Sequence, residues 1–152
     1  INTRLTGRHP MKRRTLFLAL AIAGGSLLAT GCASTTQAPQ PRIVMQVSDG
    51  DAAKWNLTLN VAGNAQKELG ADRIQIEIVA FGPGIGMLKF DAVTANRVND
   101  AIKSGVKVVA CENSMSAQKL VKADMNPAIS YVPAGVIQIM NRQNEGWAYV
   151  RP

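Results

Sequence analysis

The chain alternates between short apolar runs and longer segments in which apolar residues recur every three or four positions. The first pattern predicts β-strands and the second predicts amphipathic helices. The predicted strands are RIVMQVS (42–48), RIQIEIVAF (73–81), VKVVAC (106–111), a short strand at Ile129–Val132, and WAYV (147–150). The predicted helices are 51–70, 91–105, 114–125 and 135–146, of which the first two end at a glycine that favours a helix stop.

The order of these elements determines the predicted fold class. Strands that alternate with helices favour parallel strands joined by right-handed crossovers, with helices on both faces of the sheet. We therefore expect an α/β fold, a three-layer α/β/α sandwich with a mostly parallel sheet of about five strands. A chain of 152 residues has room for one such core and not for two.

Polar and glycine-rich stretches follow three predicted strands, at the sheet edge where α/β proteins collect their ligands. The loop GPGIG contributes Gly82, Gly84 and Gly86, which could lie against an anion. It lacks the GK[ST] ending of a phosphate-binding loop, so a plain turn bent by Pro83 is favoured. Asp49 could bind a ligand or a cation, but Asp-Gly-Asp before a helix is more simply a turn with a helix cap.

Cys111 ends the third strand, just before a polar turn that starts a helix. Exposed amides at a helix start, including those near Asn113 and Ser114, favour a thiolate and hence a nucleophilic or sulfur-carrying cysteine. The alternative is a buried small hydrophobe that continues the apolar run, because unpaired cysteine is often buried. The residues alone leave both interpretations open.

The formal charge of +7 would suggest a nucleic acid or an anionic membrane as partner. However, residues 1–32 carry five of the basic residues and no acid, so the remainder has 12 basic and 10 acidic residues, a net charge of +2. No basic stripe remains, which argues against nucleic-acid binding.

The basic N-terminal segment has the features of an export signal. Residues 11–32 combine a basic start, the apolar run LFLALAIA (16–23) and small residues before Cys32. We expect residues 1–10 to be upstream sequence, 33–42 a tether, and 43–152 the domain. The stretch LATGC (28–32) resembles a bacterial lipobox, which implies a lipid on Cys32 and a periplasm-facing, membrane-anchored protein, with the outer membrane favoured; a soluble periplasmic protein is the alternative.

The chemistry open to the domain is narrow. If Cys32 is lipidated or removed, Cys111 is the sole thiol and has no disulfide partner in its own chain. The sole histidine, His9, lies outside the domain, which excludes Ser-His-Asp and Cys-His catalysis and removes the commonest metal ligand. We therefore predict neither a metal nor a cofactor.

Four segments together resemble the DsrE/DsrF-like proteins, a group that includes sulfur-relay subunits and the YchN-like proteins. They are IVMQVSDGDAAKWNLTLNVAGNAQKELG, IEIVAFGPGIGML, VKVVACENSM and YVPAGVIQIMNRQNEGWAYVRP, within residues 42–152. The resemblance implies a homo-oligomer, often a trimer or hexamer. It also implies that Cys111 matches the cysteine that carries a persulfide between relay proteins, although this chain has Phe81 where many members have a histidine.

The sequence thus supports two hypotheses. In the first, an exported DsrE-like protein carries sulfur on Cys111 and passes it to a relay partner, as a carrier more than a turnover enzyme, with the backbone near Asn113 and Ser114 stabilising the sulfur. In the second, the protein is a non-catalytic oligomeric module with a structural cysteine, which binds a ligand or partner around Asp49, the glycine loop and Cys111.

Overall fold

The computed structural model describes residues 39–152. The predicted signal peptide, the predicted lipidation site Cys32 and most of the predicted tether lie outside the described residues. The first strand begins at Arg42, the last residue of the predicted tether.

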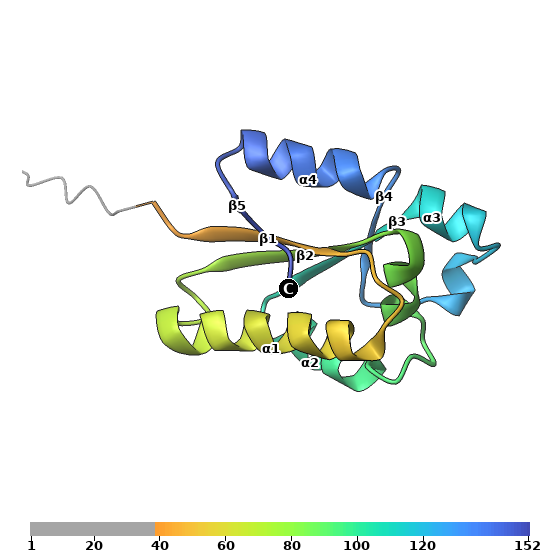
Figure 1. The fold of residues 1–152 in the computed structure, drawn as a ribbon. Helices are drawn as coiled ribbons and strands as arrows, with labels where there is room; N and C mark the ends of the chain where they lie inside the picture. Colours follow the sequence, from red (N-terminus) through yellow and green to blue (C-terminus); the bar gives the residue numbers. More distant parts are fainter. Residues whose placement is uncertain (1–38) are drawn as a thin grey trace, which may run out of the picture. The chain divides into compact units, whose positions relative to one another are not determined.

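The described chain forms a five-stranded sheet in which every pairing is parallel (Figure 1). The strand order is β4-β3-β2-β1-β5. The strands are β1 (Arg42–Val47), β2 (Gln75–Ala80), β3 (Lys107–Cys111), β4 (Ser130–Val132) and β5 (Ala148–Val150). The helices are α1 (Ala52–Leu69), α2 (Ala95–Lys103), α3 (Glu112–Ala117) and α4 (Gly135–Asn144), with 3₁₀ helices η1 (Gly82–Leu88) and η2 (Lys122–Asp124). The predicted α/β class is confirmed.

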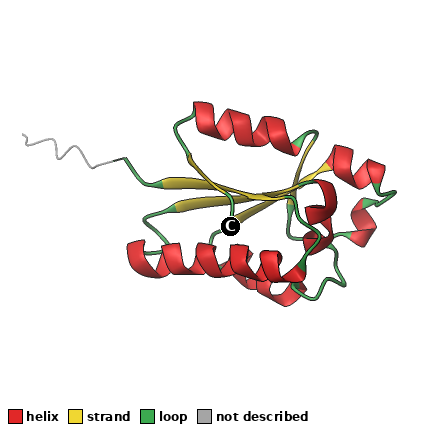
Figure 2. Cartoon of the chain, in the orientation of Figure 1, coloured by secondary structure: helices red, strands yellow, loops and turns green. Residues whose placement is uncertain are grey.

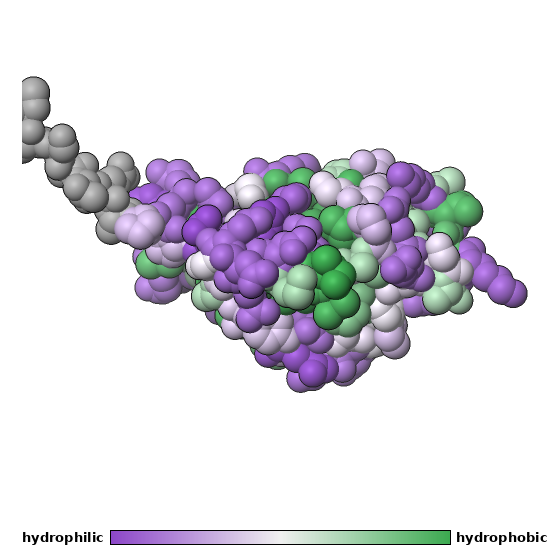
Figure 3. Space-filling model, turned by 90° about the horizontal axis from the view of Figure 1, so that it is seen from above, coloured by the Kyte–Doolittle hydropathy of each residue, from purple (hydrophilic) through white to green (hydrophobic). Residues whose placement is uncertain are grey.

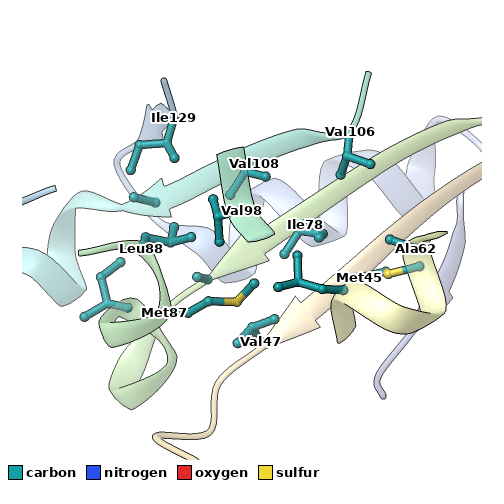
Figure 4. Packing of buried hydrophobic residues seen from close by; sticks show 14 of the residues in the cluster. Met45, Val47, Ala62, Ile78, Met87, Leu88, Val98, Val106, Val108 and Ile129 are labelled. Atoms are coloured by element: carbon teal, nitrogen blue, oxygen red, sulfur yellow. The ribbon is translucent and has the colours of Figure 1, made fainter. Parts of the chain in front are cut away.

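Helices cover both faces of the sheet, as Figures 1 and 2 show. α1 and α2 lie on one face and α4 lies on the other. The strands alternate between the two faces, so that Met45, Ile78 and Val108 join the cluster beneath α1 and α2, whereas Val44, Val79 and Val109 join a smaller cluster with Ile139 of α4. The larger cluster is the main core, and its packed side chains appear in Figure 4.

The glycine loop differs from its prediction as a plain turn, because residues 82–88 form the 3₁₀ helix η1. Pro83 occupies its first turn, where a fixed backbone angle and a missing N–H are tolerated. Gly84 is buried, and a Cβ there would lie 2.3 Å from the carbonyl oxygen of Val47. The glycines therefore allow the chain to pack tightly against the end of β1.

Two predicted helices are shorter than their patterns suggested. α2 begins at Ala95 instead of 91 because the chain forms turns at 90–91 and 93–94 first. The predicted helix 114–125 is wrong in extent, since α3 ends at Ala117 and Lys119 adopts a left-handed backbone with φ 56°. The Asp124 carboxylate then accepts a hydrogen bond from the Val121 amide at 2.8 Å, which starts η2 as a separate turn.

Candidate thiol site

Cys111 is the last residue of β3 and the residue that precedes α3. Along β3, Val109 faces α4, and the alternation of a strand places Cys111 on the same side. The exposed fraction of Cys111 is 4%. The thiol is therefore enclosed at the carboxyl edge of the sheet, between the starts of α3 and α4.

Hydrogen-bond donors surround the sulfur and change its ionisation. Burial raises the pKa of the Cys111 thiol and is the largest single influence. It is outweighed by hydrogen bonds from the Ser114 hydroxyl and from the amides of Gly135, Ser114 and Asn113, so that the pKa lies below its ordinary value. The Asn113 amide contributes least of these, and it also donates to the Pro133 carbonyl at 3.1 Å.

The Ser114 hydroxyl is oriented by Gly82, the first residue of η1. Its oxygen accepts the Gly82 amide hydrogen at 2.7 Å, which leaves its own proton free to point at the sulfur of Cys111. Gln118 donates from its side chain to the Gly82 carbonyl, also at 2.7 Å. Gly82, which has a left-handed backbone with φ 51°, is thus fixed to α3 from both sides.

The start of α4 closes the other side of the thiol. A Cβ on Gly135 would lie 3.3 Å from the Cβ of Cys111 and 3.1 Å from that of Phe81, so a larger residue there would push these neighbours away. The approach brings the Gly135 amide, at the positive end of a ten-residue helix, to the sulfur. In its thiol form the sulfur points toward the Pro133 carbonyl at 3.8 Å.

The structure bears on both interpretations that the sequence left open for Cys111. The 4% exposed fraction in the single chain agrees with the buried position of the second interpretation. The expected amide hydrogens do lie within reach. The surroundings of Cys111 combine a buried position with polar donors, which differs from a purely aliphatic core site.

The remaining predicted site residues lie elsewhere. Asp49 pairs with Arg151 at 3.4 Å, and its carbonyl accepts the indole N–H of Trp55 at 2.7 Å. Gly84 packs on Val47, and a Cβ at Gly86 would meet the Trp55 ring at 3.1 Å. The structure therefore brings Gly82, Asn113 and Ser114 to Cys111, whereas Asp49, Gly84 and Gly86 serve packing and turn formation on the side of β1 and α1.

Two surface cavities in the described part of the chain lie away from the thiol. One of about 240 Å³ lies between α1 and α2 and includes Arg97 and Asp100. The other, of about 480 Å³, lies beside Pro39–Ile43 and Ala148. Neither is lined by Cys111 or Ser114.

Sequence reasoning missed two parts of the site, Gly135 and Gln118. Gly135 was visible only as the first residue of a helix pattern, and its contact with Cys111 joins residues far apart in the chain. Gln118 was visible only as a polar residue on a predicted helix. A glycine at a helix start indicates only weakly that another segment packs closely against the backbone there. Which segment does so cannot be known without the fold.

Within residues 39–152, no helix is long and apolar enough to cross a membrane. The same residues contain no group of three or more histidine, cysteine, aspartate or glutamate side chains that could bind a metal.

The fold has counterparts among solved structures. A protein of unknown function from Methanobacterium thermoautotrophicum is 30% identical, with a TM-score of 0.71 over 74% of this chain and 99% of the other. A conserved protein of unknown function from Bacteroides thetaiotaomicron is 13% identical, with a TM-score of 0.62 over 76% of this chain and 100% of the other. The ychN protein of E. coli is 8% identical, with a TM-score of 0.59 over 74% of this chain and 99% of the other.

The last two structures share the fold at low identity. Among curated proteins, none matches the chain. The sequence profile of the DsrE/DsrF-like family matches residues 42–152, from the first residue of β1 to the end of the chain. The chain therefore belongs to the DsrE/DsrF-like family.

Proposed function

We propose that the protein is a sulfur carrier in which Cys111 holds a sulfane sulfur as a persulfide. The observation that carries this proposal is the place of Cys111 between the starts of α3 and α4, close to Gly135 and Ser114, whose donors lower the pKa of a buried thiol. Burial without donors would raise that pKa and make the cysteine inert. Membership of a family that includes sulfur-relay proteins is consistent with the same chemistry.

The transfer has two balanced steps. The Cys111 thiolate attacks the outer sulfur of a donor persulfide, so that a new S–S bond forms, the donor S–S bond breaks, and the donor leaves as a thiolate with the electron pair. The proton stays on the transferred sulfur. An acceptor thiolate then attacks that outer sulfur, and Cys111 leaves as a thiolate with no net oxidation. A low leaving-group pKa speeds the second step.

The same donors serve both states of the sulfur. The Ser114 hydroxyl and the Gly135 amide stabilise the negative charge of the attacking thiolate before transfer and of the leaving thiolate after it. Because Cys111 is 4% exposed, a donor reaches it only after the chain around Pro133–Gly135 moves. Transfer is therefore coupled to an opening of the start of α4.

Intact-mass analysis after incubation with a low-molecular-weight persulfide tests the proposal. We expect a gain of one sulfur, about 32 Da, that reducing agent removes. Cys111→Ser should show no such gain at this position. If the wild-type peptide that holds Cys111 gains no mass and also resists alkylation until denatured, the carrier function is wrong.

We further propose that the protein is exported and anchored by a lipid on Cys32. The support is the sequence pattern of residues 11–32, in which a basic start, an apolar run and small residues precede the cysteine. A periplasm-facing carrier, with the outer membrane favoured, would receive sulfur outside the cytoplasm. Metabolic labelling with a palmitate analogue should mark the wild type and Cys111→Ala, but not Cys32→Ala. Equal labelling of all three would contradict the anchor on Cys32.

A second function, an oligomeric binding module, is favoured by the outer face of α4. Val136, Ile137 and Met140 have exposed fractions of 61%, 48% and 47% in the single chain. Apolar side chains reach the surface of the molecule seen from this side (Figure 3). Burial of these side chains against other copies of the chain would remove them from water.

Light scattering coupled to size-exclusion chromatography tests this second function. We expect the wild type to run as a trimer or hexamer and Met140→Lys to run as a smaller species. Lys54→Met, a change of the opposite kind on an exposed position of α1, is the control. A wild-type monomer at all concentrations would exclude the oligomeric module.

A further inference from the structure

Glu77 is a buried carboxylate that the proposed transfer does not use. It lies in the middle of β2, and its exposed fraction is 0%. Charged side chains are rarely buried to this extent unless they are paired. Its position in the strand register, beside Val44 and Lys107, places it on the α4 side of the sheet.

The partners of Glu77 lie mainly on α4. The Gln138 side chain donates to one carboxylate oxygen at 2.5 Å, and Arg142 donates to the other through Nε at 2.9 Å and Nη2 at 2.8 Å. Lys107 of β3 approaches the same oxygen at 3.4 Å from a half-exposed position. One side chain of β2 therefore binds two successive turns of α4.

The same helix brings the Gly135 amide to Cys111. Gln138 lies three residues after Gly135 and Arg142 lies seven residues after it, so all three positions share the face of α4 that rests on the sheet. Ile139 packs between them on Val44, Val79 and Val109. The lateral and rotational position of α4 thus depends on Glu77 at one end of the contact and on Gly135 at the other.

We propose that Glu77 is a positioning residue, which holds α4 through Gln138 and Arg142 so that the start of the helix stays closed on Cys111. The proposal deepens the proposed function, since it assigns control of access and of thiolate stabilisation to a side chain that never touches the sulfur. The Glu77 proposal rests on the proposed function in one respect, because it takes Cys111 as the reacting group.

A direct electrostatic effect of Glu77 would have the opposite sign. Glu77 pairs with Lys107, four residues before Cys111, so the carboxylate lies on the order of 13 Å from the thiol along the strands. Removing a negative charge at that distance would stabilise the thiolate slightly and lower the pKa of Cys111. Loss of positioning would withdraw the Gly135 amide and raise that pKa.

Other charged groups near the two residues stay constant in the test. Lys107 and Arg142 face Glu77, and Arg142 also binds Glu145 at 2.7 Å. Beside Cys111, Glu112 pairs with Lys122 at 3.6 Å, and Lys122 lies over the ring of Tyr131 at 4.6 Å. Burial first, and then the charge of Glu112, raises the pKa of Tyr131.

The matched variants are Glu77→Gln and Glu145→Gln. Each removes one carboxylate partner of Arg142, but the Glu77 carboxylate belongs to the sheet, whereas the Glu145 carboxylate lies on the exposed end of the helix itself. The bond from Arg42 of β1 goes to the backbone carbonyl of Glu145, which the substitution leaves in place. The readout is the rate of alkylation of Cys111 against pH, followed by mass spectrometry of the peptide that holds it. The pH midpoint reports ionisation of the thiol, and the plateau rate reports access to it.

We expect Glu77→Gln to move the midpoint to higher pH and to raise the plateau rate about tenfold, the factor that follows from losing one hydrogen bond to a charged group. Glu145→Gln should match the wild type in both. A Glu77→Gln profile that overlays the wild type, or that moves to lower pH, overturns the proposal.

A second pair of variants covers a failure of Glu77→Gln to fold. Gln138→Met removes a donor to Glu77, and Gln143→Met makes the same change on an exposed position of α4. A midpoint raised only in Gln138→Met supports the proposal, and equal midpoints overturn it. These readouts follow alkylation of the thiol and not sulfur transfer. A protein whose Cys111 is alkylated but gains no sulfur therefore still tests how Glu77 positions α4.

Discussion

On the α1 and α2 side of the sheet, buried strand positions carry apolar side chains such as Met45, Ile78 and Val108, packed beneath two helices. On the α4 side, the equivalent positions of the same strands run from Glu77 and Lys107 through Val79 and Val109 to Cys111. The strand positions of the first face contribute stability through apolar burial, and hydrogen bonds such as that from Arg97 to Asn60 join the two helices above them. The second combines a small apolar cluster with a buried carboxylate and an enclosed thiol.

The difference shows that one face of the sheet can supply stability while the other holds the groups that react. A well-packed apolar face anchors the strands, so that the opposite face can carry polar groups that are costly to bury without partners. The thiol and its donors lie at the carboxyl edge of that second face, where α3 and α4 begin. Changes to the first face should therefore affect stability, and changes to the second should affect the thiol.

The largest expected effect comes from the apolar face. Ile78→Ala removes a fully buried side chain beneath α1 and α2, and we expect a loss of about 2–5 kcal/mol in the free energy of unfolding. The pH midpoint for alkylation of Cys111 in the folded fraction should not change. Urea unfolding and alkylation profiles measure the two quantities. A shifted midpoint would show that the two faces are not independent.

The next largest effect on stability is expected in the glycine-rich 3₁₀ helix η1. Gly84→Ala places a Cβ 2.3 Å from the backbone oxygen of Val47, so we expect a loss of about 1–3 kcal/mol in urea unfolding. Gly63→Ala is the control, because a Cβ there meets nothing within 4 Å. In that helix position alanine should stabilise the protein by about 0.5–1 kcal/mol. Equal effects of the two variants would contradict the packing role of Gly84.

A smaller effect on stability, but a direct one on the thiol, comes from Ser114→Ala. The change removes a hydroxyl donor to the sulfur and leaves the Gly82 amide without its acceptor. We expect the alkylation midpoint of Cys111 to rise and the free energy of unfolding to fall by about 1 kcal/mol. Ser116→Ala, on an exposed position of the same helix, should change neither. If the pH midpoint for alkylation of Cys111 is unchanged in Ser114→Ala, the hydroxyl of Ser114 does not stabilise the thiolate.

The smallest effect is a pH dependence of stability. The folded pKa of Cys111 lies below the ordinary value that the unfolded chain has, so between the two values the unfolded state binds more protons and stability rises with pH. This contribution is complete above the unfolded pKa and is lost as the pH falls through the folded one. The difference in unfolding free energy between wild type and Cys111→Ser should therefore grow from neutral to alkaline pH. A difference that shrinks over this range would contradict the lowered pKa.

The sequence predicted those parts of the molecule that depend on local patterns. Apolar runs placed the strands, and the helical repeat placed α1 almost to the residue. Within the site, Cys111 and Ser114 are three residues apart, so the start of α3 was enough to bring them together. Local sequence also predicted a helix cap within Asp-Gly-Asp. In the structure this cap is Asp51, whose side chain accepts a hydrogen bond from the Ala53 amide at 2.8 Å.

The parts that depend on distant contacts were not predictable. Glu77 alternates with isoleucines in RIQIEIVAF, a pattern typical of a strand with one face toward solvent, but α4 covers that face and buries it. Gly135 reaches Cys111 only because α4 crosses back over the sheet. The short α3 reflects competition from Asp124, whose bond to the Val121 amide favours a new turn over helix continuation.

The central claim is that Cys111 ionises more readily in the folded protein than in the unfolded chain. A chain with Cys32→Ala keeps Cys111 as its single thiol, so the alkylation rate against pH can be measured in buffer and again in concentrated urea. We predict a lower pH midpoint in the folded protein than in urea. A folded midpoint equal to or above the unfolded one would contradict the account and identify Cys111 as a packing residue.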